Sequence, residues 1–397
     1  MVTIMYRAYN STSIGASHIF SGRVCQDCSA SVSNERYKLA VVSDGHGSGD
    51  FFRSDRGSRF AVECFCKCAD EAFGAESGYA DELAQCDDEK IYDLIKCFMS
   101  KVVEDWNKLV ENDLSGEPFS DEEMANVTDH ARAHYENGKD LHSAYGATLI
   151  GAIITDSYWF GIHIGDGKCV SFSRDGEASE PIPWDEMCYN NVTTSICSPS
   201  AVSEFRYFFS RELPAAVFLG SDGIDDSFAS PKYHHDFYRL VLSTFATEDE
   251  EQACAELNEY LPELSAQGSG DDMSIAYIVD IDAVKASPEL FEKKKSPYLR
   301  ILRVGNFGAA NSSDDYMQRG ELEAYVGRVQ LDLLGLWGFQ AGIMDFDIVA
   351  VEGDAVTIAV SGTEYKVTPA ERAEITFRET VNGVSEYDTL FIYCMMK

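Results

Sequence analysis

Short apolar runs that end in an aspartate beside a glycine constrain the fold of this 397-residue chain more than any other feature. Residues 39–43 run directly into Asp44-Gly45, and residues 215–220 end at Ser221-Asp222-Gly223. Asp166, in Ile-Gly-Asp-Gly, and Asp271, in Gly-Ser-Gly-Asp-Asp, have the same kind of setting. Apolar runs of this length, bounded by Gly and Asp, favour buried strands over helices. We therefore expect strands that carry aspartates at their ends.

Amphipathic helices and hairpins surround these strands. Apolar residues with a helical period predict helices near residues 54–72 and 91–109, and a further helix over 248–266. Between residues 147 and 176, β-branched runs alternate with the turns Thr155-Asp156-Ser157 and Gly165-Asp166-Gly167, which predicts hairpins. This pattern indicates an α+β fold with antiparallel sheets and helices packed outside them.

The composition changes near residue 283, so we expect two domains. Residues 1–283 form the first, 284–298 with the run Glu-Lys-Lys-Lys form a linker, and 299–397 form a small α+β domain. In the last segment the pattern predicts a helix over residues 320–334. It also predicts strands over residues 347–351, 355–360, 364–367 and 389–395.

The charge excludes some classes of partner. The 32 basic and 67 acidic residues give a net charge of −35, which opposes binding to nucleic acid or to anionic membrane surfaces. No apolar run approaches the roughly 18 residues of a membrane span, and no signal peptide is visible. The 12 cysteines include no paired C-x-x-C motifs, which is typical of reduced thiols. We expect a soluble, cytoplasmic protein.

Aspartates at strand ends suit the binding of divalent cations. A rigid sheet holds the carboxylates while they face solvent, and hard cations prefer such oxygen ligands. Glycine beside each aspartate lets a main-chain carbonyl or a water approach closely. Taken alone, any one Asp-Gly pair is more typical of a turn than of a metal site. Four of them across one domain favour a metal site.

The order of these motifs resembles that of the type 2C metal-dependent protein serine/threonine phosphatases. The resemblance covers about residues 10–281, and the opening Ser17-His18-Ile19 with Cys25-Gln26-Asp27 is more similar to the bacterial branch. The matching segments, in order, are Gly22…Cys25-Gln26-Asp27, Val42-Ser43-Asp44-Gly45-His46-Gly47, Gly146-Ala147-Thr148-Leu149, Ile164-Gly165-Asp166-Gly167, Leu219-Gly220-Ser221-Asp222-Gly223 and Gly270-Asp271-Asp272-Met273-Ser274.

The resemblance implies a sandwich of two antiparallel sheets flanked by helices, with two Mg²⁺ or Mn²⁺ ions and a weaker third at one end. Asp44 would bridge both metals, Asp27 would act near the second through water, and Asp166 would support the third. The complete implied set of metal-binding groups is Asp27, Asp44, the Gly45 carbonyl, Asp166, Asp222 and Asp271.

The implied reaction is hydrolysis of phosphoserine or phosphothreonine in proteins by a metal-activated water, without a covalent intermediate. His46 would either protonate the leaving group or hold a carboxylate, and both readings stay open. For the phosphate, Arg23 is one candidate, and Arg53 and Arg56 are alternatives.

Two features depart from the family pattern. Gln26 stands where animal relatives have a glutamate, and Arg23 is displaced by one position from the expected phosphate-binding arginine. They favour an alternative in which the chain is a weak or silent phosphatase-like module that binds a phosphoprotein or a regulatory partner. The C-terminal domain would recruit substrate or regulate access in either case.

Overall fold

A computed structural model describes residues 6–188, 192–228 and 231–292, together with seven strands between residues 297 and 396. The chain divides into two compact units, Met1–Lys293 and Lys294–Lys397. Each unit is described by itself. Within the described residues, no helix is both long and apolar enough to cross a membrane.

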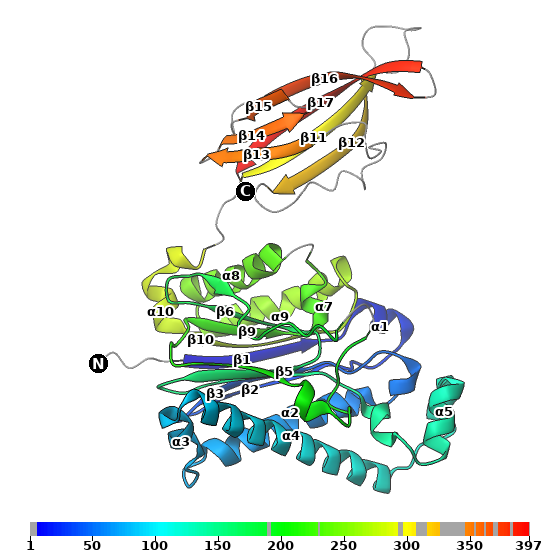
Figure 1. The fold of residues 1–397 in the computed structure, drawn as a ribbon, viewed down its shortest axis with the longest axis vertical. Helices are drawn as coiled ribbons and strands as arrows, with labels where there is room; N and C mark the ends of the chain where they lie inside the picture. Colours follow the sequence, from blue (N-terminus) through cyan, green and yellow to red (C-terminus); the bar gives the residue numbers. More distant parts are fainter. Residues whose placement is uncertain are drawn as a thin grey trace. The chain divides into compact units, whose positions relative to one another are not determined.

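The first unit contains two antiparallel sheets that lie face to face (Figure 1). One sheet has the order β1-β10-β9-β6-β7, with strands Tyr6–Ser13, Met273–Asp280, Ala216–Gly220, Lys168–Phe172 and Ala178–Ser179. The other has the order β2-β3-β4-β5-β8, with strands Cys28–Ser33, Lys38–Ser43, Leu149–Ile154, Trp159–Ile164 and Arg206–Ser210.

The space between the sheets is filled by side chains that point inward from alternate strand positions. Ala40 and Val42 of β3 meet Val217 and Leu219 of β9 in one apolar cluster, and all four are fully or almost fully buried. The spacing of two residues is the period at which a strand presents one face. The predicted strands are therefore buried on both sides, as their continuous apolar character indicates.

Helices cover the outer faces of both sheets (Figure 1). Phe65 of α2 and Trp106 of α4 are fully buried against the β2–β8 sheet, and Tyr238 of α8 is fully buried against the other. The helices on the first side are α2 (Ser54–Phe73), α3 (Tyr79–Gln85), α4 (Asp88–Gly116), α5 (Asp129–Glu136) and α6 (Ala201–Glu204). Those on the second side and near the ends of its strands are α1 (Ala16–Ser21), α7 (Asp222–Asp225), α8 (Pro231–Thr247), α9 (Glu250–Gln267) and α10 (Ile281–Ala286).

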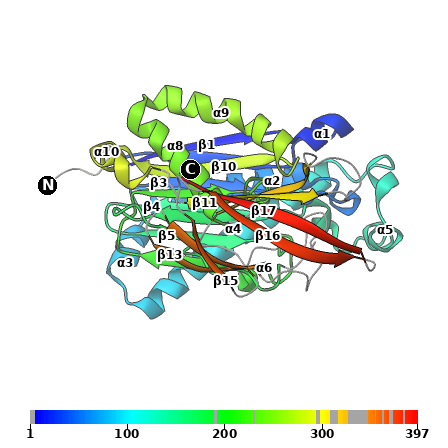
Figure 2. The same cartoon turned by 90° about the horizontal axis from the view of Figure 1, so that it is seen from above.

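This architecture confirms the predicted sandwich of two antiparallel sheets flanked by helices, including the helices expected near residues 54–72, 91–109 and 248–266. Seen from above, α9 runs beside β1 and reaches α1 (Figure 2). At this contact Ala16 donates its N–H to the Ser265 hydroxyl, at 2.9 Å. Ala16 and Ser265, which are far apart in the sequence, therefore meet at one end of the sandwich.

Residues 284–292 differ from the expected linker 284–298. They include the end of α10 and a short 3₁₀ turn, Pro288–Leu290, within the first unit. Val284 is fully buried and Phe291 is only 1 % exposed, and both pack into the core under α8 and α9. The charged run that suggested a linker lies just after these apolar anchors, and residues 293–296 lie outside the described part.

The second unit is described by its strands alone. Its two antiparallel sheets have the orders β12-β11-β17-β16 and β13-β14-β15. The strands are Pro297–Asn306, Tyr316–Tyr325, Phe346–Glu352, Ala355–Val360, Thr363–Val367, Arg372–Val381 and Val384–Met396, in chain order. The four predicted strands are confirmed, whereas β11, β12 and β16 were not foreseen. The helix predicted over 320–334 is wrong for residues 320–325, which belong to β12, and residues 326–334 lie outside the described part.

Candidate metal and phosphate site

Three of the predicted aspartates meet at one end of the sandwich. Asp44 follows β3, Asp222 opens α7 directly after β9, and Asp271 lies just before β10. They line one pocket of about 790 Å³. The other predicted residues that line it are Arg23, Gly45, His46 and Asp166.

Main-chain hydrogen bonds fix the loop that carries Asp44. Asp44 donates its N–H to the Thr148 hydroxyl at 3.0 Å, and Thr148 donates its N–H to the Asp44 carbonyl at 2.8 Å. Gly45 donates its N–H to the Gln26 carbonyl at 3.1 Å. A Cβ at position 45 would lie 2.7 Å from both the Gln26 and Ser54 carbonyl oxygens. Glycine is therefore required here by close backbone packing.

The carboxylates of this site repel one another. Burial, followed by the charges of Asp222 and Asp27, raises the pKa of Asp44 well above its usual value. Burial also raises the pKa of Asp222 to about 6, against a hydrogen bond with Asp44 that lowers it. For Asp27, burial raises the pKa to about 8, and Asp272 and Asp222 add to the effect of burial. Bound cations would relieve this repulsion.

Two buried oxygen atoms fit a metal site. Asp27 is 9 % exposed, and its Oδ2 has no hydrogen-bond partner. Gln26 lines the pocket, and its buried Oε1 has no hydrogen-bond partner. Its amide nitrogen donates to Ser54 Oγ and to the His46 carbonyl. Carboxylate, amide and main-chain oxygens are the ligands that Mg²⁺ and Mn²⁺ prefer. The residues present therefore fit divalent cations.

Asp166 lies in the turn between β5 and β6 and faces the same pocket. Thr193 donates its hydroxyl proton to Asp166 Oδ2 at 2.5 Å. Thr193 was not predicted, because it comes from the segment between β7 and β8 and no motif surrounds it in the sequence.

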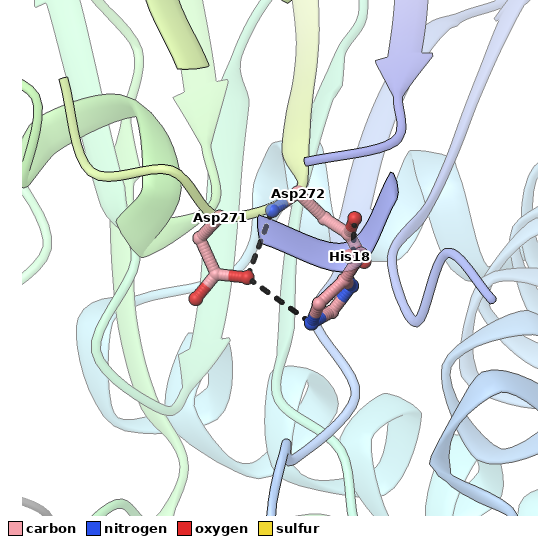
Figure 3. A group of neighbouring side chains, drawn as sticks. All are labelled: His18, Asp271 and Asp272. Atoms are coloured by element: carbon pink, nitrogen blue, oxygen red, sulfur yellow. Dashed lines mark hydrogen bonds and ion pairs between the residues drawn. The ribbon is translucent and has the colours of Figure 1, made fainter. Parts of the chain in front are cut away.

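His18 and Asp272 form a second group with Asp271 that the sequence did not predict (Figure 3). His18 Nδ1 lies 3.0 Å from Asp272 Oδ1, and His18 Nε2 lies 3.9 Å from Asp271 Oδ1. The ligand atoms of all three residues lie within 4.8 Å of one another. The neighbouring acids Asp271 and Asp272 were visible in the sequence, but nothing linked them to a histidine some 250 positions earlier.

Asp272 also connects three segments of the chain. Its Oδ1 accepts the N–H of Gly15 and its Oδ2 accepts the N–H of Gln26, both at 2.6 Å. A Cβ on Gly15 would lie 2.4 Å from the Asp271 carbonyl carbon, so this approach also requires glycine. The Asp272 carboxylate thus holds both N-terminal loops of the site against the start of β10.

His46 lies in the pocket and packs edge to face on Phe51, with ring centroids 4.9 Å apart. Burial lowers the pKa of His46, and the nearby charge of Asp166 opposes this effect only in part. The neutral imidazole is therefore favoured in the metal-free site.

The two predicted phosphate ligands have different surroundings. Arg23 is exposed at the pocket, and its Nη1 donates to the Gly47 carbonyl at 3.3 Å. Arg53, however, is only 1 % exposed and does not line the pocket. Its guanidinium binds Glu123, at 2.6 Å from Nε to Oε1, and also Asp113 and the Tyr145 hydroxyl. The prediction for Arg53 is corrected, because every contact that fixes this side chain is internal.

Arg56 is engaged in the same network. Its Nη1 lies 3.0 Å from Asp113 Oδ2 and 2.8 Å from Glu117 Oε2. Among the three candidate arginines, Arg23 alone lines the pocket.

The part of the chain that forms most of this site matches a known protein family. The profile of the family described as protein phosphatase 2C matches residues 14–262. This range includes every residue that lines the pocket except Asp271 and Asp272. The chain belongs to the protein phosphatase 2C family. Membership supports a metal-dependent phosphatase. No protein of curated function matches the chain.

Several solved structures are similar to this protein phosphatase 2C chain. The S. agalactiae serine/threonine phosphatase is 15 % identical, with a TM-score of 0.43, and the match covers 69 % of this chain and 99 % of that one. The Staphylococcus aureus serine/threonine phosphatase Stp1 is 13 % identical, with a TM-score of 0.43 and coverage of 69 % and 95 %. The catalytic domain of the phosphatase PstP, in complex with two manganese ions, is 14 % identical, with a TM-score of 0.42 and coverage of 69 % and 97 %.

Proposed function

We propose that this protein removes phosphate from phosphoserine and phosphothreonine in proteins by direct attack of water. The observation that carries the proposal is the convergence of Asp44, Asp222 and Asp271 on one pocket, with Asp27 buried beside them. Burial, and then the charges of neighbouring aspartates, raises the pKa values of Asp27, Asp44 and Asp222. Such a cluster destabilises a protein unless cations compensate it. A purely structural role gives no reason to retain it.

The side chains have separate tasks in this reaction. Bound Mg²⁺ or Mn²⁺ supplies an activated water and offsets the negative charge of the phosphoryl oxygens. Asp44, the Gly45 carbonyl, Asp222 and Asp271 would hold the cations, with Asp27 beside a second ion and Asp166 beside a weaker third. Arg23 and His46 both line the pocket. Arg23 would contact the phosphate, and His46 would exchange a proton with the leaving oxygen.

Hydrolysis of p-nitrophenyl phosphate and of phosphoserine and phosphothreonine peptides in Mn²⁺ or Mg²⁺ tests the proposal. We expect turnover that Asp44→Asn and Asp222→Asn each reduce at least about a hundredfold, since both remove charge from the cation site. Asp156→Asn, in the exposed turn between β4 and β5, is the matched control and should keep full activity. A correctly folded protein that shows no turnover with excess metal would contradict the proposal.

A silent phosphatase-like module that binds a phosphoprotein is the second candidate. Gln26 supports it, because a neutral amide, already bonded to Ser54 and to the His46 carbonyl, stands beside Asp27. Binding of an intact phosphopeptide without release of phosphate would favour this candidate.

We further propose a cytoplasmic protein whose second unit recruits the phosphoprotein or regulates access to the site. The 11 cysteines of the first unit, from Cys25 to Cys254, are free thiols, which supports a reducing compartment. The net charge of −35 opposes nucleic-acid and membrane-surface partners. Comparing kcat/KM of the full chain with that of residues 1–293, on p-nitrophenyl phosphate and on a phosphoprotein, separates the two roles. If the second unit recruits substrate, its removal should lower kcat/KM for the phosphoprotein and leave kcat/KM for p-nitrophenyl phosphate unchanged.

A further inference from the structure

His18 has an environment that the proposed reaction does not yet explain. Its side chain is 9 % exposed and lies at the pocket, with Asp272 on one side of the ring and Asp271 on the other (Figure 3). The Nδ1 atom is buried and makes no hydrogen bond of good geometry, although Asp272 Oδ1 lies 3.0 Å away. A buried imidazole between two acids requires a physical reason.

Contact with Asp272 determines which ring nitrogen carries the proton. Asp272 Oδ1 already accepts the Gly15 N–H, and Oδ2 accepts the Gln26 N–H, so this carboxylate acts as an acceptor. An unprotonated Nδ1 would set its lone pair against that oxygen at 3.0 Å, which is unfavourable. From this close approach we assign the proton of a neutral ring to Nδ1, which leaves the lone pair on Nε2.

The Nε2 lone pair then faces the other carboxylate. The 3.9 Å between Nε2 and Asp271 Oδ1 is too long for a hydrogen bond. The distance is short enough for both atoms to bind one cation, because two metal–ligand bonds of about 2.0–2.2 Å span at most about 4.4 Å. Without a cation, the Nε2 lone pair and the Asp271 carboxylate repel each other. A cation between them would replace this repulsion with two metal–ligand bonds.

We propose that His18 Nε2 and Asp271 bind the same divalent transition metal, with Asp272 as the residue that positions the imidazole. This inference rests on the proposed function, because Asp271 belongs to the proposed cation site. A carboxylate that orients a metal-binding histidine through its other ring nitrogen is a common arrangement. An imidazole ligand suits Mn²⁺ and later transition metals better than Mg²⁺. The site should therefore prefer Mn²⁺ to Mg²⁺.

The test uses the full chain loaded with one equivalent of Mn²⁺. Pulsed electron paramagnetic resonance should detect ¹⁴N modulation from a coordinated imidazole in the wild type. His18→Ala should abolish the modulation, whereas His130→Gln, at an exposed position of α5, should leave it unchanged. Calorimetric titrations should show Mn²⁺ affinity reduced at least about tenfold in His18→Ala, with a smaller loss for Mg²⁺.

His18→Gln is the conservative variant, because it offers an amide oxygen near the position of Nε2. It should retain Mg²⁺ affinity, lose the ¹⁴N modulation and lose the preference for Mn²⁺. Circular dichroism of each variant checks the fold, and His18→Gln keeps the test decisive if His18→Ala unfolds.

The opposite results would overturn the inference. Unchanged Mn²⁺ affinity and unchanged ¹⁴N modulation in folded His18 variants would show that the ring is not a ligand. Unchanged metal affinity with weaker orthovanadate binding would instead place His18 against the phosphoryl group. Hydrolysis by a wild type without ¹⁴N modulation would refute this inference alone, and ¹⁴N modulation without hydrolysis would refute the proposed reaction alone.

Discussion

Replacing Asp27 with asparagine is expected to stabilise the metal-free protein and to destabilise it relative to wild type once Mn²⁺ is added. The carboxyl group is buried, and its Oδ2 has no hydrogen-bond partner. Asparagine has nearly the same shape and no charge. The substitution therefore isolates the cost of keeping an ionised group at this position.

The magnitude follows from the pKa of Asp27, which burial and the charges of Asp272 and Asp222 raise from 3.8 to about 8. A pKa that is higher in the folded state favours folding fully below about pH 4, and this contribution is lost as the pH rises through 8. The difference of about 4 pH units corresponds to about 5 kcal/mol at most. Because asparagine must also place its amide hydrogens, we expect a gain of about 2–5 kcal/mol at pH 8 and much less at pH 5.

Urea unfolding in EDTA at pH 5 and pH 8 measures this effect. For a first unit of this size, with a slope of about 3 kcal/mol/M, the midpoint of Asp27→Asn should exceed that of wild type by about 1 M at pH 8. Asp156→Asn, at an exposed turn position, should leave the urea midpoint unchanged at both pH values. Saturating Mn²⁺ should reverse the order, because it binds the folded wild type more tightly. An Asp27→Asn midpoint no higher than wild type at pH 8 in EDTA would refute the reasoning.

The remaining predictions concern arginine and glycine positions. Arg53→Met should lower the free energy of unfolding by about 3 kcal/mol, because it leaves Glu123 without its buried partner, and KM of the folded enzyme should not change. Arg23→Ala should raise KM for a phosphopeptide several-fold with no change in melting temperature. A loss of stability in Arg23→Ala, with a raised KM in Arg53→Met, would contradict the roles given to these two arginines. Gly57→Ala should destabilise α2 by about 1–3 kcal/mol or more in urea unfolding, since its Cβ would lie 1.8 Å from the Tyr145 carbonyl oxygen. At an exposed position in a helix, by contrast, replacing glycine with alanine would raise the free energy of unfolding.

The sequence predicts the main strands and helices, and the positions of Asp44, Asp222 and Asp271 at strand ends, because the signal for each is local. The arrangement of the strands as a sandwich is implied by the resemblance to the family. An apolar strand that ends in Asp-Gly positions its own carboxylate, and the sheet then aligns the strand ends. The same locality explains the wrong prediction for Arg53. Its neighbours in the sequence suggest a helix start beside the metal loop, but its partners Asp113 and Glu123 lie some 60–70 positions later.

The group formed by His18, Asp271 and Asp272 could not be predicted for a related reason. It depends on the register of β1 with β10, which pairs Ser13 with Met273 and so brings α1 beside the start of β10. No periodicity in either segment specifies that pairing. In the second unit, the helix predicted over residues 320–334 overlaps β12 at residues 320–325, where a short polar and apolar run fits either element.

The contact of Asp272 with Gly15 and Gln26 has a consequence for how the protein is made. The N-terminal loops are translated more than 240 residues before the carboxylate that fixes them. Contacts so distant along the chain form late and slowly. A nascent chain therefore carries Asp27 and Asp44 through most of its synthesis without a complete binding site. The proposed cation site is complete only after β10 has left the ribosome and paired with β1, so we expect metal uptake at this site late in the folding of the first unit.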